Sequence, residues 1–169
     1  GNGIGRKSHA FCIDVIRKLS EKNMPLVIDA DAIKAISLKD AKNAIFTPHK
    51  REFQMLLENT HIRKLQLQKY IGNNVIIVKG NVDVIYAKGK IKYNKTGNPA
   101  MTVGGTGDVL AGLAVGFYAQ TKDAWNSAIA AAYINGICGD MARGELHAGL
   151  IASDMLKKIA MVTEEMLAK

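Results

Sequence analysis

The sequence lacks any apolar run long enough to cross a membrane, and its first residues show no signal-peptide pattern. These two absences predict a cytoplasmic protein with no membrane partner. Cysteine is scarce as well, because Cys12 and Cys138 lie far apart and neither belongs to a metal-binding spacing. We therefore expect two buried, reduced thiols.

Aromatic residues make up only 6% of the chain, and no long basic cluster occurs despite a formal net charge of +8. The lysines and arginines are scattered, and their tightest groupings are pairs such as Lys50-Arg51. Surfaces that bind nucleic acids interleave basic residues with aromatic side chains that stack on the bases. The sequence therefore indicates no nucleic-acid partner, and we interpret the charge as a solvated surface that attracts anionic metabolites.

Hydrophobic residues are plentiful: they account for 48% of the 169 residues, against 22% charged residues. This balance is typical of a globular domain with a sizeable core. No internal repeat, low-complexity tract or interdomain linker is visible, so the chain is expected to form a single domain.

Three short apolar runs predict parallel strands, and each of them ends in polar residues. These are residues 26–28 before Asp29 and Asp31, residues 44–46 before Thr47-Pro48-His49, and residues 75–78 before Lys79-Gly80. Ligands of open α/β sheets bind at the carboxyl ends of the strands, so these polar residues are candidates for one site. Each also has a structural interpretation. The aspartates can form a turn or a helix cap, His49 can be structural or simply exposed, and Lys79 can be a surface turn residue.

The remaining segments complete an α/β pattern. Hydrophobic residues alternate with period two from Val82 to Tyr93, which predicts an antiparallel hairpin. Helical segments are predicted after Ser8 and at residues 32–36, 50–58, 62–70, 109–120, 124–143 and 150–167. The sequence therefore predicts a mostly parallel central sheet flanked by helices, with one added hairpin.

A glycine-rich loop, residues 96–108, runs directly into the apolar helix 109–120. Its glycines allow backbone amides to approach a ligand, and the free N–H groups at a helix start bind phosphate well. Asp108 has two open interpretations: it or Thr106 caps the helix, or Asp108 takes a proton from a hydroxyl that attacks a phosphoryl group. The loop is not a P-loop, since Asp108 follows the final glycine. A second phosphate-compatible element at Lys79 favours the base, as in phosphoryl transfer by sugar kinases.

Six motifs, taken in order, resemble those of the ADP/ATP-dependent NAD(P)H-hydrate dehydratases, which belong to the ribokinase-like superfamily. They are Gly1-Asn2-Gly3-Ile4-Gly5-Arg6, Val27-Ile28-Asp29-Ala30-Asp31-Ala32, Thr47-Pro48-His49 with Glu52-Phe53, Val78-Lys79-Gly80, the stretch 96–112, and Gly149-Leu150-Ile151-Ala152-Ser153-Asp154. The resemblance implies a three-layer ribokinase-like fold. Members of the family carry further strands and helices before the first motif, so we expect residues 1–169 to form one such domain, incomplete at its N-terminus.

The resemblance also implies an activity, the repair of nicotinamide cofactors hydrated on the nicotinamide ring. Asp108 would deprotonate the ring hydroxyl, ADP or ATP would phosphorylate it, and loss of phosphate would regenerate NADH or NADPH. Mg²⁺ is the expected cofactor and would bridge the phosphates. The implied anion hole consists of Gly105, Thr106 and Gly107. The implied nucleotide-binding residues are Lys79, Gly80, Asn81, Val82, Asp83 and Gly107, and those facing the hydrated cofactor are Gly3, His49 and Asp108.

The chain departs from the family pattern at a few positions. Asn2 replaces the usual proline of the first motif, Thr106 replaces a frequent methionine, and Lys50-Arg51 stand where a small residue and a glycine are common. Two other functions stay open: a small-molecule alcohol kinase of the same superfamily, and a non-catalytic nucleotide-binding module. A homo-oligomer is also expected, with the apolar helix 109–120 as a candidate contact.

Overall fold

A computed structural model describes residues 2–168, without the side chains of residues 6 and 167. Gly1, the first residue of the first glycine motif, lies outside the described residues. The chain forms a five-stranded sheet in the order β1-β2-β3-β4-β5. The strands are β1 (Leu26–Ile28), β2 (Ala44–Phe46), β3 (Val75–Val78), β4 (Asp83–Ala87) and β5 (Lys90–Asn94). The pairings β1–β2 and β2–β3 are parallel, whereas β3–β4 and β4–β5 are antiparallel.

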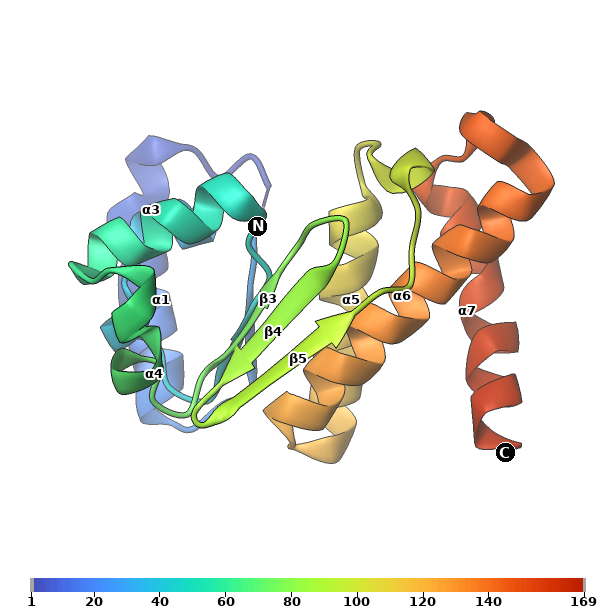
Figure 1. Ribbon diagram of the computed structural model, residues 1–169. Coiled ribbons are helices and arrows are strands. Elements are labelled where there is room, and N and C mark those ends of the chain that lie inside the picture. Colours follow the sequence, from blue (N-terminus) through green and yellow to red (C-terminus); the bar gives the residue numbers. More distant parts are fainter. Residues whose placement is uncertain (1, 169) are drawn as a thin grey trace.

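Helices cover both faces of this sheet, which gives the three layers seen in Figure 1. On one side lie α1 (His9–Glu21), α2 (Asp31–Ala35), α3 (Lys50–Thr60) and α4 (Leu67–Tyr70). On the other side lie α5 (Thr106–Thr121), α6 (Ala124–Leu146) and α7 (Ala152–Leu167). Short 3₁₀ turns join these elements: η1 (Arg6–Ser8), η2 (Leu38–Asp40), η3 (Lys64–Gln66), η4 (Pro99–Met101) and η5 (His147–Gly149).

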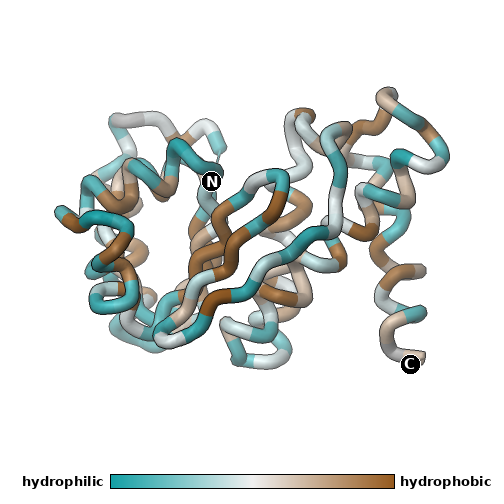
Figure 2. Tube along the Cα trace, viewed as in Figure 1, coloured by the Kyte–Doolittle hydropathy of each residue, from teal (hydrophilic) through white to brown (hydrophobic). Residues whose placement is uncertain are grey.

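The strands are hydrophobic on both faces, so the sheet divides the interior into two cores. Ile45, Val75 and Ile77 pack against α5, α6 and α7, whereas Phe46 and Ile76 face the core built with α1 to α4. This alternation follows from the period of two along a strand. Figure 2 shows the central strands as hydrophobic over most of their length. Buried parallel strands read as continuous apolar runs for this reason, and the expected α/β arrangement is confirmed.

The largest differences from the expected helices occur at two places. The segment 62–70 is not one helix, because His61 adopts a left-handed conformation at the end of α3, and only the 3₁₀ turn η3 and the four-residue α4 follow. The helix after the glycine loop begins at Thr106 rather than at Val109. Asp108 therefore lies inside the first helical turn.

The structure tests two expectations from composition, the buried thiols and the lack of a membrane-spanning segment. Cys12 and Cys138 are both buried and free of disulfides, as expected. Among the described residues, no helix combines the length and the hydrophobicity needed to span a bilayer.

Candidate active site

The carboxyl ends of the parallel strands meet at one edge of the sheet. The backbone N–H of Lys79 donates to the carbonyl of Pro48 at 2.8 Å, and His49 and Lys79 form an isolated parallel bridge. Asp29, which follows β1, lies beside them: its Oδ1 accepts from the Thr47 hydroxyl at 2.7 Å and from Lys79 Nζ at 3.1 Å. Strand ends separated by 50 residues in the chain thus form one cluster.

This cluster holds the Lys79 ammonium against the start of α5. The Lys79 and Asp29 side chains are only 23% and 12% exposed, and Thr47 is fully buried. A Cβ built on Gly107 would lie 3.2 Å from Lys79 Nζ. A cation beside the positive end of a helix is unfavourable by itself, and the Asp29 carboxylate offsets the charge of the Lys79 ammonium. The ammonium and the N–H groups at the start of α5 together favour a bound anion.

Neither Asp108 nor Thr106 caps α5. The N-cap is Gly105, with φ of 94°, and it offers no side-chain acceptor to the first turn. The Thr106 hydroxyl instead donates to the carbonyls of Met101 and Val103, at 2.8 and 3.1 Å, which closes the glycine loop on itself. Asp108 is exposed and accepts a hydrogen bond from Asn2 Nδ2 at 2.5 Å. The capping interpretation is therefore wrong, and the first turn of α5 has no side-chain cap.

A cavity of about 590 Å³ opens between Lys79, the glycine loop and α6. Its lining includes most of the expected nucleotide-binding residues, namely Lys79, Gly80, Asn81, Asp83 and Gly107, together with Thr106 and His49. The exposed Val82 does not line it, nor do Gly3, Gly105 or Asp108. Asp108 lines a separate apolar groove of about 480 Å³ between α5 and α7. The start of α5 thus presents Gly107 to one space and Asp108 to another.

Two polar groups shape this first cavity in ways that the sequence did not reveal. Asp83 accepts hydrogen bonds from the Gly80 amide and from Asn94 Nδ2, at 3.0 and 3.1 Å, while burial raises the pKa of its carboxyl group. Asn135 on α6 lines the same cavity, and its buried Oδ1 has no hydrogen-bond partner in the described part of the chain. An orphaned buried acceptor costs free energy, so a ligand donor at this position would be stabilising.

The glycine loop rests directly on α6. Asp140 accepts hydrogen bonds from the Gly97 amide and from Asn98 Nδ2, at 2.9 and 2.8 Å. A Cβ on Gly136 would lie 2.1 Å from Thr96 Oγ1, so only glycine permits this close approach. The sequence identified α6 as a buried, alanine-rich helix but gave no sign of this contact, because it joins segments 40 residues apart.

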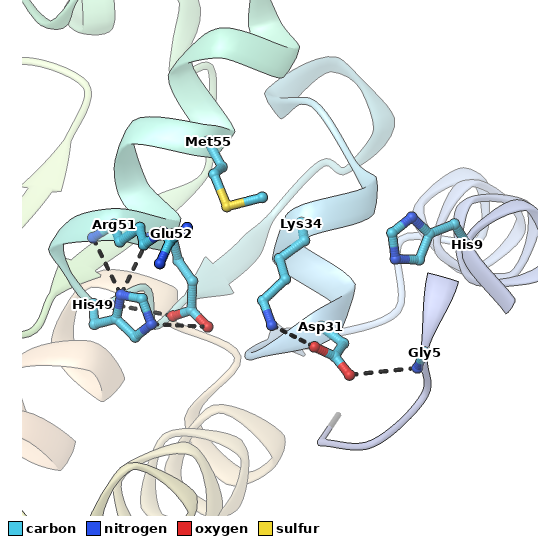
Figure 3. Close-up of a pocket in the computed structure, with 8 residues that line it drawn as sticks. All are labelled: Gly5, His9, Asp31, Lys34, His49, Arg51, Glu52 and Met55. Atoms are coloured by element: carbon cyan, nitrogen blue, oxygen red, sulfur yellow. Dashed lines mark hydrogen bonds and ion pairs between the residues drawn. The ribbon is translucent and has the colours of Figure 1, made fainter. Parts of the chain in front are cut away.

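A second pocket, here called the α1–α3 pocket, lies on the other side of His49 (Figure 3). It also has a volume of about 590 Å³, and its lining consists of Gly5, His9, Asp31, Lys34, His49, Arg51, Glu52 and Met55. Lys34 Nζ lies 2.5 Å from Asp31, and this hydrogen bond, aided by the Gly5 amide, lowers the pKa of the Asp31 carboxyl group. His49 is shared by the two spaces.

His49 has a structural role in addition to its position. Its Nδ1 accepts from the amides of Arg51 and Glu52, at 3.1 and 3.2 Å, and so caps α3. In return Glu52 accepts from the His49 amide at 3.0 Å, which completes a capping box. The ring nevertheless remains 52% exposed, so both its structural and its binding interpretations are compatible with this geometry.

Comparison with known proteins shows which family this chain resembles. Residues 1–161 match the family model described as NAD(P)H-hydrate dehydratase. The bifunctional NAD(P)H-hydrate repair enzyme Nnr of Pyrobaculum aerophilum is 38% identical over 172 residues, which cover 96% of this chain and 34% of that protein. The chain thus spans about a third of the length of this relative and of the Nnr enzymes of Hyperthermus butylicus and Methanocaldococcus jannaschii, which it also matches.

Solved structures agree with this assignment. A ribokinase-like superfamily protein from Enterococcus faecalis matches with a TM-score of 0.80 and 26% identity, over 96% of this chain and 60% of that one. The ADP/ATP-dependent NAD(P)H-hydrate dehydratase from Bacillus subtilis, co-crystallized with ATP/Mg²⁺, matches with a TM-score of 0.74 and 26% identity, over 90% and 58% of the two chains. The ribokinase-like fold expected from the sequence is confirmed.

Proposed function

Since the chain belongs to the NAD(P)H-hydrate dehydratase family, we propose that its protein restores hydrated NADH and NADPH at the expense of ADP or ATP. One observation carries the proposal: Lys79 Nζ and the uncapped start of α5 converge on the 590 Å³ cavity, with the position of a Gly107 Cβ only 3.2 Å from the ammonium. Such a combination of cation and amides suits the phosphates of a nucleotide.

In this proposal, the residues of the cavity bind the donor nucleotide. Lys79, Gly80, Asn81 and Asp83 hold it from the strand side, with Val82 in the same turn, and Gly107 holds it from α5. The amides of Gly105, Thr106 and Gly107 receive the negative charge that builds on the transferred phosphoryl group. The orphaned Oδ1 of Asn135 supports a ligand that carries a hydrogen-bond donor, such as the amino group of adenine.

Asp108, on the opposite side of the first turn, acts as the base. It takes the proton of the ring hydroxyl, whose oxygen attacks the terminal phosphorus as the bond to the shortened nucleotide breaks. The phosphate ester then loses phosphate, with a proton leaving the neighbouring ring carbon, and the double bond returns. Gly3 and His49 hold the hydrated cofactor, and the hydrogen bond from Asn2 brings the segment that contains Gly3 next to Asp108.

Mg²⁺ enters this proposal with the nucleotide. Within the described residues, no three histidine, cysteine or acidic side chains gather into a metal cage. The ion would therefore be held by the phosphates and by water, as Mg²⁺ commonly is, and it would supply charge neutralisation. We also propose the homo-oligomer expected from the sequence, and exposed apolar residues of α5 such as Val115 support it.

The test is an assay of the full-length protein with hydrated NADH, Mg²⁺ and either ADP or ATP. The return of NADH absorbance measures the reaction. We expect Asp108→Asn to lower kcat about 10²- to 10⁴-fold, the range for loss of a general base. The control is Asp14→Asn, which removes an exposed carboxylate of α1 and should leave kcat unchanged.

Two results would contradict the proposal. Phosphorylation of an added thiazole or pyrimidine alcohol without any recovery of NADH would indicate a small-molecule kinase. Nucleotide binding with an activity that Asp108→Asn does not change would indicate a non-catalytic nucleotide-binding module.

A further inference from the structure

The α1–α3 pocket contains a cation that the proposed reaction does not use. Arg51, the second residue of α3, lines this pocket, and its guanidinium makes no hydrogen bond or ion pair with any described residue. Its backbone N–H donates to His49 Nδ1 at 3.1 Å. In Figure 3 the side chains of Arg51, Lys34 and His9 come from three different helices, and Lys34 lies between the other two. The five N–H donors of Arg51 are therefore available to a ligand.

The two carboxylates of the pocket have other partners than Arg51. Asp31 is engaged by Lys34 at 2.5 Å and by the Gly5 amide at 3.4 Å. Glu52 is buried, accepts from the His49 amide and lies 3.4 Å from His49 Nε2, so it serves the start of α3. Among the described residues, neither carboxylate forms an ion pair with Arg51, so its guanidinium is available to a ligand. The pocket is suited to an anion.

The position of the pocket indicates which part of a ligand it would receive. His49 lines both cavities, and Gly5 belongs to the segment that Asn2 links to Asp108. The pocket therefore borders the space between His49 and Asp108, where the proposed function places the hydrated ring. A dinucleotide is too long for that space alone and must extend beyond it. The α1–α3 pocket offers such an extension with a volume of about 590 Å³.

The chemistry of arginine narrows the anion to a phosphate. Its planar guanidinium binds phosphate oxygens with two parallel hydrogen bonds, and an arginine commonly accommodates the 2′-phosphate that distinguishes NADP from NAD.

We propose that the α1–α3 pocket binds the 2′-phosphate of hydrated NADPH and that Arg51 makes the enzyme prefer hydrated NADPH to hydrated NADH. This inference rests on the proposed function and deepens it. Hydrated NADH presents only a ribose hydroxyl at the same place, so it gains nothing from the guanidinium. Lys34 adds charge from α2 but is shared with Asp31, so the selectivity depends mainly on Arg51.

The test compares the two hydrated cofactors in the full-length enzyme and in Arg51→Gln. We expect the substitution to lower kcat/KM for hydrated NADPH about tenfold or more, the range for a hydrogen bond to a charged group, through KM rather than kcat. The value for hydrated NADH should change less than about twofold. Lys50→Gln removes the neighbouring cation, which lines neither cavity, and should preserve the preference.

A second measurement separates this inference from the proposed function. Calorimetric titration with 2′-AMP should show binding to the unaltered protein that Arg51→Gln weakens about tenfold. Arg51-dependent binding in a protein that dehydrates neither cofactor would support the pocket and refute the reaction. Dehydration of both cofactors with a preference that Arg51→Gln leaves unchanged would refute the pocket and keep the reaction. Equal losses for both cofactors would place the diphosphate bridge at Arg51, which also overturns the proposal.

Discussion

At the scale of single residues, the polar ends of the parallel strands carry most of what the sequence could predict. Asp29, His49 and Lys79 each follow an apolar run, and parallel strands bring such positions together. Their partners could not be predicted. The ion pair between Asp29 and Lys79 joins residues 50 positions apart, and its formation depends on the register of β1, β2 and β3.

The capping role of His49 illustrates another limit at this scale. A histidine caps a helix less often than serine, threonine, asparagine or aspartate. The residue type therefore does not predict that Nδ1 of His49 accepts from two amides of α3. In contrast, Glu52, three residues later, is the partner that a capping box requires. The sequence therefore contains the glutamate of the capping box but does not show that His49 is its partner, and it leaves the function of His49 open.

The Asp29–Lys79 pair leads to the first prediction at this scale. Under the proposed function, Lys79→Met should lower kcat/KM for the nucleotide about 10²-fold, since it removes the cation proposed to bind the phosphates. Asp29→Asn should cost about tenfold, because the ammonium loses its anchor while the Thr47 hydroxyl keeps an acceptor. Initial rates at varied nucleotide concentration measure both effects.

A double variant shows whether Asp29 acts through Lys79. If it does, Asp29→Asn combined with Lys79→Met should be no slower than Lys79→Met alone. Fully multiplied losses would refute the connection. Lys88→Met, in the exposed turn between β4 and β5, is the matched control and should be neutral.

At the scale of elements, hydrophobic period and glycine content located the strands, the hairpin and the long helices. The apolar runs at 26–28, 44–46 and 75–78 coincide with β1, β2 and β3. Helix termini were less predictable, because α5 starts in the glycine loop with no capping side chain and the segment 62–70 is interrupted after the left-handed His61. Local sequence preferences do not specify where a loop packed on another helix will end.

The contact between the glycine loop and α6 gives the prediction for this scale. Gly136→Ala should reduce the free energy of unfolding by about 1–3 kcal/mol, since the new Cβ would lie 2.1 Å from Thr96 Oγ1 and 2.6 Å from the Thr96 carbonyl carbon. Denaturant unfolding followed by circular dichroism measures the change.

A second glycine of the same helix provides the comparison. Gly144→Ala places its Cβ in open space and should stabilise the protein by about 0.5–1 kcal/mol, because alanine restricts the unfolded chain and favours a helix. Equal effects of the two substitutions would show that α6 and the loop are not in close contact.

At the scale of the whole molecule, the presence of a core on each side of the sheet could be predicted, but the residues that form each core could not. Continuous apolar strands indicate that both faces are covered. The distribution of charge depends on tertiary structure instead. Asp40 is an example, since it receives hydrogen bonds from Ser37 and from Arg17 of α1, and so ties that helix to η2.

The pKa values of such carboxyl groups predict how stability depends on pH. Burial pushes the pKa of Asp40 upward, but the Ser37 amide, Arg17 and the Ser37 hydroxyl outweigh it, so the net shift is downward. The unfolded chain then binds more protons at acidic pH, and the stabilisation, complete above the ordinary aspartate range, is lost as pH falls through the lowered pKa. Asp31 and Asp123 shift in the same direction, through Lys34 and the Asn126 amide respectively.

The corresponding prediction concerns acid unfolding of the complete protein. Asp40→Asn should reduce stability by about 1–2 kcal/mol at pH 7. The difference from the unaltered protein should begin to shrink near pH 4, where Asp40 of the unfolded chain takes up a proton, and should be smallest once pH has fallen below the lowered pKa of the folded state. Thermal melting across pH measures this gap. A gap that is constant or widens toward low pH would contradict the assignment, and the exposed Asp14→Asn should show no gap.

The shared position of His49 has one further consequence. Its ring lines both cavities and at the same time holds the first turn of α3. A ligand that moves the ring in one cavity changes what the other cavity offers, so the two binding equilibria are linked. If the ligands are those of the proposed function, thermodynamic reciprocity requires that the nucleotide alters the affinity for the hydrated cofactor by the same factor by which the hydrated cofactor alters the affinity for the nucleotide. The exchange of the Arg51 and Glu52 amides with solvent would report this coupling from within the helix.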